Sequence, residues 1–290
     1  MNHIERYQQQ DLEQTWSFEI YNKYIGVEWK WHFFPFDDDF TKKNLVWNYT
    51  VKNPVRGKSI MEVGSAMGQG FFYLEKLGVD LSDYTGFEVS EMGVNKAKQR
   101  FPNANWIHAN FTNTKLERRY DYGFEREAIH HMPEPVEQIH KILKHIDITF
   151  VTTFVGCIEG KTISDLDNAY YNNFEKGFVY FNVISVSEVV EKALLEGFNH
   201  IRIIYWGEHE PIPIDKDGHQ YMSPELQASR DIARFTLRMT KEPSLLQPII
   251  YEVIAGKLGG IKLKLISEPV KVIRVKAAVK QMQVEATKNY

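Results

Sequence analysis

Short apolar runs alternate with amphipathic segments through the middle of the chain, and this alternation predicts an α/β fold. The expected strands are 59–68 together with its turn, 84–89, 105–109, 122–125, 148–154, 199–205 and 234–240. Segments with helical spacing of apolar residues separate most of these strands. Strands that alternate with helices form βαβ units, in which the helices cover the faces of a mostly parallel sheet.

Capping residues mark where the helices begin and end. Ser90 is expected to cap the helix after the second strand, and Gly78 to end the helix before that strand. Ser185 and Glu188 have the spacing of a capping box, in which each residue's side chain accepts the other's backbone N–H. Gly197 then ends that helix.

The apolar pattern also divides the chain into segments. Residues 1–50 show approximate helical spacing and predict an N-terminal helical cap, with a lid over the substrate as the alternative. Residues 51–243 form the main domain, and two polar stretches in it, 157–182 and 207–230, are expected insertions on the substrate side. Residues 244–290 form a C-terminal extension, rich in lysine, that packs on its own domain or serves as an oligomer arm, partner contact or membrane-surface segment.

A glycine-rich turn follows the first strand, in the stretch SIMEVGSAMGQG. The strand ends near Glu62, and glycines follow at Gly64, Gly68 and Gly70. Glycines allow a ligand to approach the backbone closely. A dinucleotide fingerprint that begins at Gly64 would need glycines where this chain has Ala66 and Gln69, and the G-K-[ST] of a P-loop is absent. The turn therefore indicates a nucleotide or a nucleoside-like cofactor of another kind.

Glu88 at the end of the second strand supports a nucleoside-like ligand. A carboxylate at this place can accept hydrogen bonds from both hydroxyls of a ribose. Glu88 lies 24 residues after Gly64 in the printed sequence, near the roughly 20-residue separation of nucleotide-binding βαβ units.

The motif E-x-G-x-A-x-G resembles the first motif of the class I, Rossmann-like S-adenosylmethionine (SAM)-dependent methyltransferases. A second segment, YDYGFEREAIHHMPEP, resembles the family's fourth strand and the loop after it; the matching positions are Tyr120, Asp121, Ile129, His130, His131 and Pro135. The resemblance covers roughly 55–243. It implies a seven-stranded, mostly parallel sheet whose last strand is antiparallel, with helices on both faces, and SAM as cofactor. The expected N-terminal helical cap and C-terminal extension lie outside the range that the resemblance covers.

The resemblance also implies a set of cofactor-binding residues. These are Glu62, Gly64, Ser65, Ala66, Gly68, Glu88, Val89, Asn110, Phe111 and Glu125. Asn110 stands where the family often has an acid, and its amide oxygen can still accept a hydrogen bond from the adenine amino group. Ala66 places a methyl group where glycine is usual, which is tolerable if its φ is negative.

Two adjacent histidines raise the question of a base or a metal. His131, or else His130, is the expected general base if the acceptor must lose a proton. Neighbouring side chains diverge on a helix and no third ligand is evident, so we expect no metal.

The sequence constrains the methyl acceptor less than the donor. The expected activity is in-line transfer of a methyl group from SAM to a small molecule (a natural product, sugar or metabolite), with Trp31, Tyr170 and Tyr171 as candidate acceptor contacts. Two alternatives stay open: a non-catalytic SAM-binding partner subunit, and a methyltransferase that acts on a macromolecule. Neither the acceptor nor the methylated atom follows from the sequence.

Composition excludes several classes of partner. A net charge of −3 over 290 residues gives no electrostatic case for nucleic acid, and the single cysteine, Cys157, excludes an internal disulfide. No apolar run approaches the roughly 20 residues of a membrane span, and the N-terminus is polar. We therefore expect a cytoplasmic protein, with the C-terminal extension as one route to a homo-oligomer.

Overall fold

A computed structural model of the protein describes residues 59–157, 160–162, 170–174, 177–205, 232–243 and 249–254. The expected N-terminal cap, the insertion 207–230 and most of the C-terminal extension lie outside these residues. Within the described ranges, no helix is long and apolar enough to cross a membrane.

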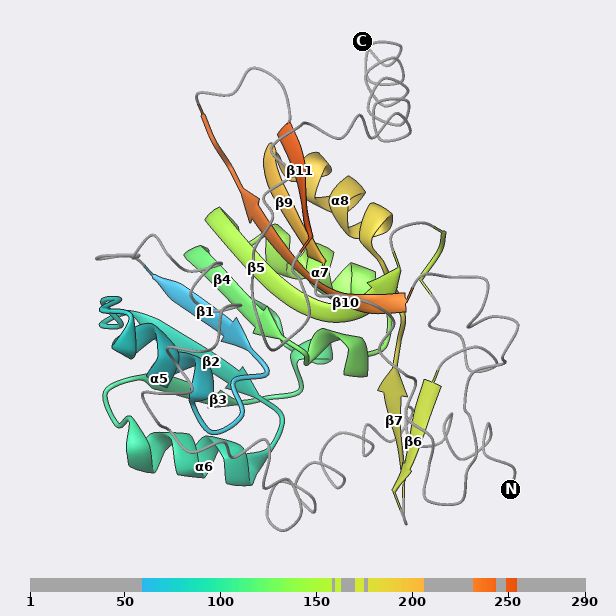
Figure 1. Ribbon diagram of the computed structural model, residues 1–290. Helices are drawn as coiled ribbons and strands as arrows, with labels where there is room; N and C mark the ends of the chain where they lie inside the picture. Colours follow the sequence, from blue (N-terminus) through green and yellow to red (C-terminus); the bar gives the residue numbers. More distant parts are fainter. Residues whose placement is uncertain are drawn as a thin grey trace.

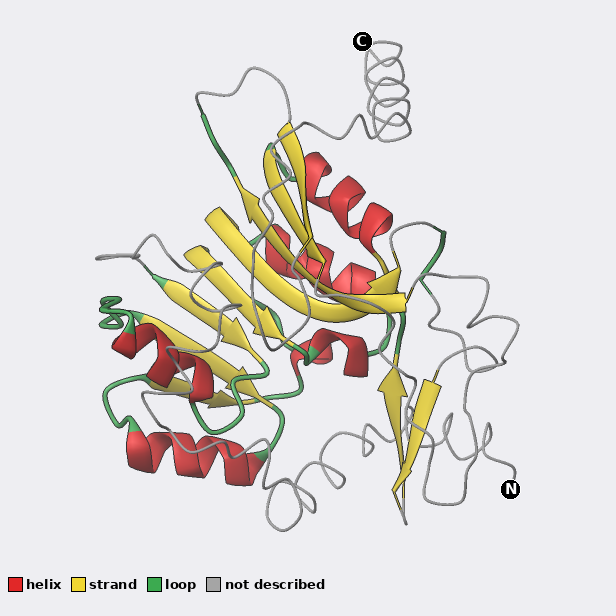
Figure 2. Cartoon of the chain, in the orientation of Figure 1, coloured by secondary structure: helices red, strands yellow, loops and turns green. Residues whose placement is uncertain are grey.

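One large mixed sheet forms the centre of the protein (Figures 1 and 2). Its strands are β1 (Ile60–Val63), β2 (Tyr84–Glu88), β3 (Asn105–His108), β4 (Tyr120–Arg126), β5 (Ile146–Cys157), β8 (Ile184–Ser185), β9 (His200–Tyr205), β10 (Ile232–Thr240) and β11 (Ile249–Ile254). The order is β11-β9-β10-β5-β4-β1-β2-β3, with the short β8 paired to β5. All pairs are parallel except the two made by β10. The seven expected strands and the antiparallel last one are confirmed.

The sheet is larger than the sequence predicts. Residues 249–254, part of the expected C-terminal extension, form β11 and pair in parallel with β9. The segment IIYEVI is rich in β-branched and aromatic residues, which favours a strand. The polar insertion 157–182 contains a hairpin of its own, β6 (Tyr170–Phe174) with β7 (Gly177–Phe181), which forms a separate two-stranded sheet.

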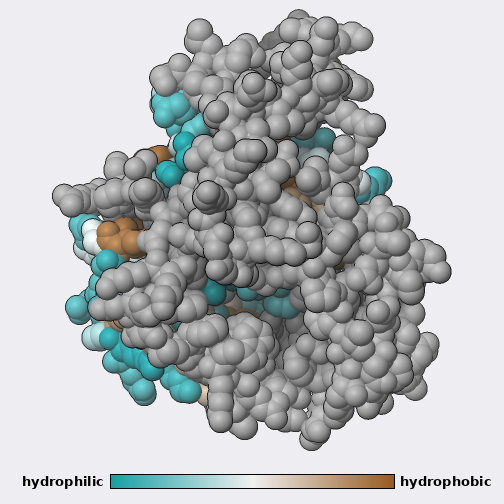
Figure 3. All heavy atoms as spheres, viewed as in Figure 1, coloured by the Kyte–Doolittle hydropathy of each residue, from teal (hydrophilic) through white to brown (hydrophobic). Residues whose placement is uncertain are grey.

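Helices cover both faces of the sheet. They are α5 (Gln69–Lys76), α6 (Glu91–Arg100), α7 (Pro135–Leu143) and α8 (Val186–Leu195). Side chains of α5 and α6 pack in one apolar cluster with Ile60 and Val151, whereas those of α7 and α8 pack in another with Met61 and Phe150. Adjacent strand residues thus face opposite layers, as the pleat of a strand requires. The outer side of α6 is polar, and hydrophilic atoms gather where it lies, at the lower left of Figure 3.

The structure has the predicted helix caps, but only half of the predicted capping box. Ser90 Oγ accepts the Gly93 N–H at 3.1 Å, and Gly78 and Gly197 follow their helices with φ of 74° and 82°. Ser185 Oγ accepts the Glu188 N–H at 3.4 Å, but the reciprocal half of the capping box is absent. The Ser185 N–H donates instead to Thr162 Oγ1, and the Glu188 carboxylate accepts the Thr162 N–H. Thr162 comes from the insertion, so sequence spacing alone cannot anticipate this exchange.

Candidate functional site

The carboxyl ends of the parallel strands β1, β2 and β4 meet at one edge of the sheet. The chain leaves β1 toward β2 on one side, while β4 lies on the other side, so the strand order reverses at β1. Ligands of open α/β sheets bind at this kind of switch point. Three buried glutamates lie at or near these strand ends: Glu62 on β1, Glu88 on β2 and Glu125 on β4.

The glycine turn after β1 is held by the backbone of β2. The N–H groups of Gly64 and Ser65 both donate to the Phe87 carbonyl, at 2.9 and 3.1 Å. Gly64 has a φ of 73°, and a Cβ on it would lie 2.2 Å from the Cβ of Ala128, in the loop after β4. Only glycine permits this contact between the two loops.

Ala66 does not have the negative φ that the sequence analysis required for its methyl group. Its φ is 48°, in the left-handed region, which costs roughly 1–2 kcal/mol in a residue with a Cβ. Its N–H donates at 2.7 Å to Oε2 of Glu88, a hydrogen bond to a carboxylate that offsets part of this cost.

Glu88 joins the end of β2 to the glycine turn. Oε2 accepts the Ala66 N–H, and Oε1 accepts the Ser90 N–H at 2.9 Å. Burial raises the pKa of Glu88, while the backbone hydrogen bonds oppose that rise. A carboxylate offers about four acceptor positions, so Glu88 retains acceptor capacity beyond the backbone N–H groups that it accepts, which include that of Val89. A vicinal diol, such as that of a ribose, supplies two further donors.

Glu62 lies inside the protein, beneath the first turn of α5. It is 4% exposed and accepts a short hydrogen bond from the Tyr84 hydroxyl. A Cβ on Gly70 would lie 2.1 Å from Oε1 of Glu62, so the carboxyl group packs directly against the helix backbone. Burial is the main cause that raises the pKa of Glu62, to about 7. These contacts indicate that Glu62 supports the glycine turn from below.

Two other predicted cofactor residues flank Glu88. Ser65 is 1% exposed, and its Oγ makes no hydrogen bond to any of the described residues. Val89 is half-buried directly after β2, and its carbonyl is 3.0 Å from Nε2 of His108. Ser65 and Val89 thus lie on the two sides of the Glu88–Ala66 hydrogen bond.

The residues after β3 form a short 3₁₀ turn, η1 (Phe111–Asn113). Asn110 caps it, since its Oδ1 accepts the Thr112 N–H at 3.1 Å. Phe111 is 3% exposed and packs edge-on against Phe87, so it belongs to the core of the protein. Lys141, on α7, donates from Nζ to the carbonyls of Phe111 and Thr112, at 2.6 and 3.2 Å.

Glu125 holds the loop that follows its own strand. Its Oε1 accepts the N–H groups of Ala128 and Ile129 at 2.6 and 2.8 Å, and its Oε2 accepts a short hydrogen bond from Thr152. Burial is the main cause that raises its pKa, to about 7. Glu125 is 2% exposed, so its carboxylate faces this loop rather than solvent.

The two histidines lie in a second 3₁₀ turn, η2 (Ile129–His131). His130 is 4% exposed, and His131 is half-buried. Their ring centroids are 4.1 Å apart, so the side chains contact each other and do not diverge as expected for neighbours on a helix. Among the described residues, no group of three or more His, Cys, Asp or Glu has the geometry of a metal site.

The structure places the remaining candidates as follows. Tyr170 and Tyr171 begin β6, in the hairpin that is separate from the main sheet. Trp31 lies outside the described residues. One buried residue that the sequence analysis missed, Asn182, contacts the histidine turn directly. A single asparagine after an insertion gives no sequence signal of such a contact.

A family model and several solved structures are similar to this chain. Residues 61–147 match the family model described as "Methyltransferase domain". The DhpI-SAM-HEP complex is 15% identical, with a TM-score of 0.50 over 82% of this chain and 99% of that one. Magnesium protoporphyrin IX methyltransferase from Synechocystis PCC 6803 with bound SAM is 12% identical, with a TM-score of 0.46 over 77% and 96%.

The glycopeptide N-methyltransferase MtfA with S-adenosylhomocysteine (SAH) is 12% identical, with a TM-score of 0.42 over 71% of this chain and 91% of that one. No curated protein sequence matches this chain significantly. The family match runs from β1 to the start of β5, and this range carries the glycine turn and all three buried glutamates. Residues 61–147 of this protein therefore match a methyltransferase domain, and its fold is similar to that of the DhpI-SAM-HEP complex.

Proposed function

We propose that this protein transfers the methyl group of SAM to a small-molecule acceptor, and that the strand-end site of β1, β2 and β4 binds the donor. The observation that carries this proposal is the 2.7 Å hydrogen bond from the Ala66 N–H to Glu88. It joins the glycine turn and the acidic strand end into one site, so that a ligand held by Glu88 also lies against the turn.

The residues present fit the chemical groups of SAM. Glu88 retains acceptor capacity for the two ribose hydroxyls, and the buried Ser65 Oγ offers a hydroxyl to a polar atom of the ligand. Val89 and Asn110 flank the place where the base would lie, after β2 and β3. When bound, SAM supplies a methyl group that its sulfonium already activates for displacement. The protein then has to align the acceptor with that methyl group and exclude water.

The histidine turn supports an acceptor site beside the donor. It follows β4, at the same sheet edge, and His131 is only half-buried, whereas His130 is almost fully enclosed. His131 is thus the better placed of the two to take a proton from an acceptor. A small acceptor agrees with the net charge of −3, which gives no electrostatic attraction for nucleic acid.

Replacement of Glu88 tests the donor site. Glu88→Ala removes the acceptor of two ribose hydrogen bonds, each worth about 1.5–3 kcal/mol when one partner is charged. We expect affinity for SAH, measured by isothermal titration calorimetry, to fall at least about 100-fold. Glu91→Ala, an exposed glutamate three residues further on, is the matched control and should leave affinity unchanged.

Circular dichroism is used to check that Glu88→Ala is folded. Unchanged SAH affinity in a folded Glu88→Ala protein would contradict the proposed donor site. The acceptor class is then tested with a panel of small molecules, with release of SAH as the readout. Turnover only on protein or nucleic acid would contradict the small-molecule assignment.

A further inference from the structure

Asn182 is a fully buried polar residue that lies at the base of the β6–β7 hairpin. It follows β7 directly, and its exposed fraction is 0%. A buried amide is costly unless it is hydrogen-bonded, so its partners explain why it is there.

All the hydrogen bonds that Asn182 donates go to the histidine turn, residues 129–132. Its backbone N–H donates to the His130 carbonyl at 2.8 Å, and its Nδ2 donates to the carbonyls of His130 and Met132 at 3.0 and 2.7 Å. A flipped amide would place Oδ1 against two carbonyl oxygens. The orientation of the side chain is therefore determined by the turn.

Glu125 contacts the same turn from the opposite end. It accepts the N–H groups of Ala128 and Ile129, at the start of the turn, while Asn182 donates to carbonyls at its end. The two residues come from different elements, β4 and the segment after β7, so the turn is fixed to both. Short 3₁₀ turns have poor internal hydrogen bonds, and this one depends on such external partners.

We propose that Asn182 is a positioning residue for His131: its amide fixes the histidine turn, and thereby the imidazole, relative to the donor site. The inference rests on the proposed function in that His131 faces the acceptor. A side chain that holds a reacting group in place lowers the cost of alignment without contacting the substrate. The same hydrogen bonds attach the base of the β6–β7 hairpin to this turn.

The test compares Asn182→Ala and the isosteric Asn182→Asp with the wild-type protein. Both variants lose the two Nδ2 hydrogen bonds, and Asp additionally places an acceptor against two carbonyls. Asn199→Ala is the control, because Asn199, just before β9, also makes two side-chain-to-backbone hydrogen bonds: Nδ2 donates to the carbonyl of Glu242, just after β10, and Oδ1 accepts the Glu242 N–H.

Amide hydrogen exchange and the NMR titration of selectively ¹³C-labelled histidine rings are the readouts. We expect the amides of His131 and Met132 to exchange at least about ten-fold faster in both Asn182 variants, and the ring signals of His131 to shift. Asn199→Ala should change neither. The ring signals of His131 are identified as those that are absent from the spectrum of His131→Gln.

Unchanged exchange and unchanged His131 signals in a folded Asn182→Asp protein would overturn the proposal. Equal acceleration of exchange throughout the sheet would overturn it as well, since Asn182 would then only stabilise the fold. Because these measurements need no ligand, they are independent of SAH binding. Failure of the wild-type protein to bind SAH would refute the proposed function and leave the positioning of His131 to be judged by exchange alone.

Discussion

At the scale of single residues, the three buried glutamates of the ligand edge have different partners and therefore different roles. Glu88 accepts backbone N–H groups and retains acceptor capacity at the site. Glu62 accepts from Tyr84 and packs under α5, and Glu125 holds the loop after β4. The family motif identifies acids at such positions, but only the contacts of each carboxylate show how these three glutamates differ.

The raised pKa values of Glu62 and Glu125 predict how stability depends on pH. Each pKa is about 7 in the folded protein, against 4.5 for an unperturbed glutamate. Between these values the folded protein binds more protons than the unfolded chain, so stability decreases as pH rises from about 4.5 to about 7. A shift of this size is worth on the order of 3 kcal/mol for each group.

Glu62→Gln tests this dependence, because glutamine keeps the shape and the acceptor for Tyr84 but does not titrate. In the wild-type protein, we expect the free energy of unfolding in urea to be lower at pH 7.5 than at pH 5. In Glu62→Gln, this difference should be roughly half as large. Glu75→Gln, at an exposed position of α5, is the control and should leave the difference intact. An unaltered pH dependence in Glu62→Gln would show that Glu62 is ionised across this range.

At the scale of elements, both short 3₁₀ turns of the ligand edge are held by side chains from elsewhere. Lys141 of α7 binds two carbonyls of η1, and its Nζ lies 4.5 Å from the ring centroid of Phe111. Partial burial lowers the pKa of Lys141. The loop that carries Asn110 is thus attached to α7, which covers the opposite face of the sheet from α6.

Lys141→Met tests this attachment, since methionine keeps an unbranched apolar stem and loses the ammonium group. Loss of two charged hydrogen bonds in a partly exposed place should lower the free energy of unfolding by about 1–2 kcal/mol. Affinity for SAH should fall several-fold as the Asn110 loop loosens. Lys144→Met, exposed at the end of the same helix, should change neither quantity. Equal effects of the two substitutions would argue against a specific role for Lys141.

The elements that the sequence predicts well are those determined by local pattern. The alternation of strands and helices, the cap at Ser90 and the glycine at Gly197 depend on residues within a few positions, and they are confirmed. The errors arise from partners distant in sequence. Thr162 displaces half of the capping box, and Glu88 supplies the hydrogen bond that accompanies a left-handed Ala66.

The same limit applies to the site as a whole. The glycine turn and the acid at Glu88 follow from motif and spacing, since strand ends of a parallel sheet meet at one edge. Neither the inward position of Glu62 nor the contact of Asn182 with the histidine turn follows, because both depend on how side chains pack in three dimensions. The sequence does not indicate β11, because seven strands already complete the sheet of the family that it resembles.

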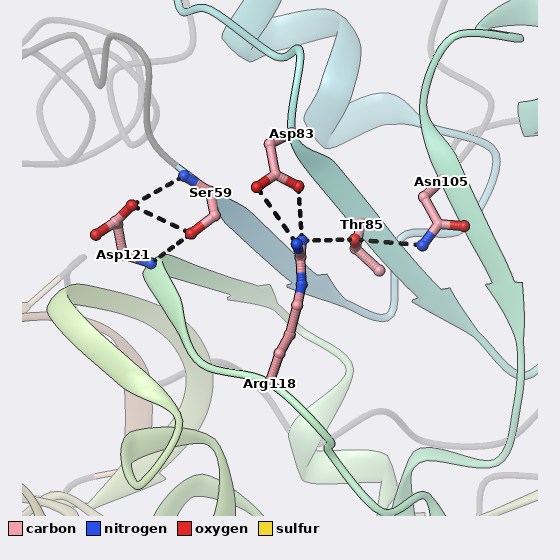
Figure 4. Close-up of polar contacts among 6 residues, drawn as sticks. All are labelled: Ser59, Asp83, Thr85, Asn105, Arg118 and Asp121. Carbon is pink, nitrogen blue, oxygen red and sulfur yellow. Dashed lines mark hydrogen bonds and ion pairs between the residues drawn. The ribbon is translucent and has the colours of Figure 1, made fainter.

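At the scale of the whole molecule, the two ends of the parallel strands carry different polar networks. The site lies at the carboxyl ends of the strands, whereas a second network lies at their amino ends (Figure 4). There Ser59, before β1, exchanges hydrogen bonds with Asp121 of β4, and Arg118 forms an ion pair of 2.7 Å with Asp83, before β2. These contacts join the starts of three strands and lie at the opposite ends of those strands from the proposed donor site.

Ser59→Ala tests whether this second edge only stabilises the fold. The substitution removes the hydroxyl that donates to Asp121 and accepts its N–H, at 3.1 and 3.0 Å, while the Ser59 N–H still donates to the carboxylate. In this partly buried place we expect a loss of about 1–2 kcal/mol, which lowers the melting temperature by a few degrees.

Affinity for SAH should be unchanged in Ser59→Ala, whereas Glu88→Ala should lose affinity while remaining folded. Ser82→Ala is the control, because Ser82 is an exposed serine before β2 that does not join two strands. This substitution should alter neither the melting temperature nor the affinity for SAH. A fall in SAH affinity in Ser59→Ala would show that the two edges are coupled through β1, since Ser59 and the glycine turn lie at opposite ends of that one four-residue strand.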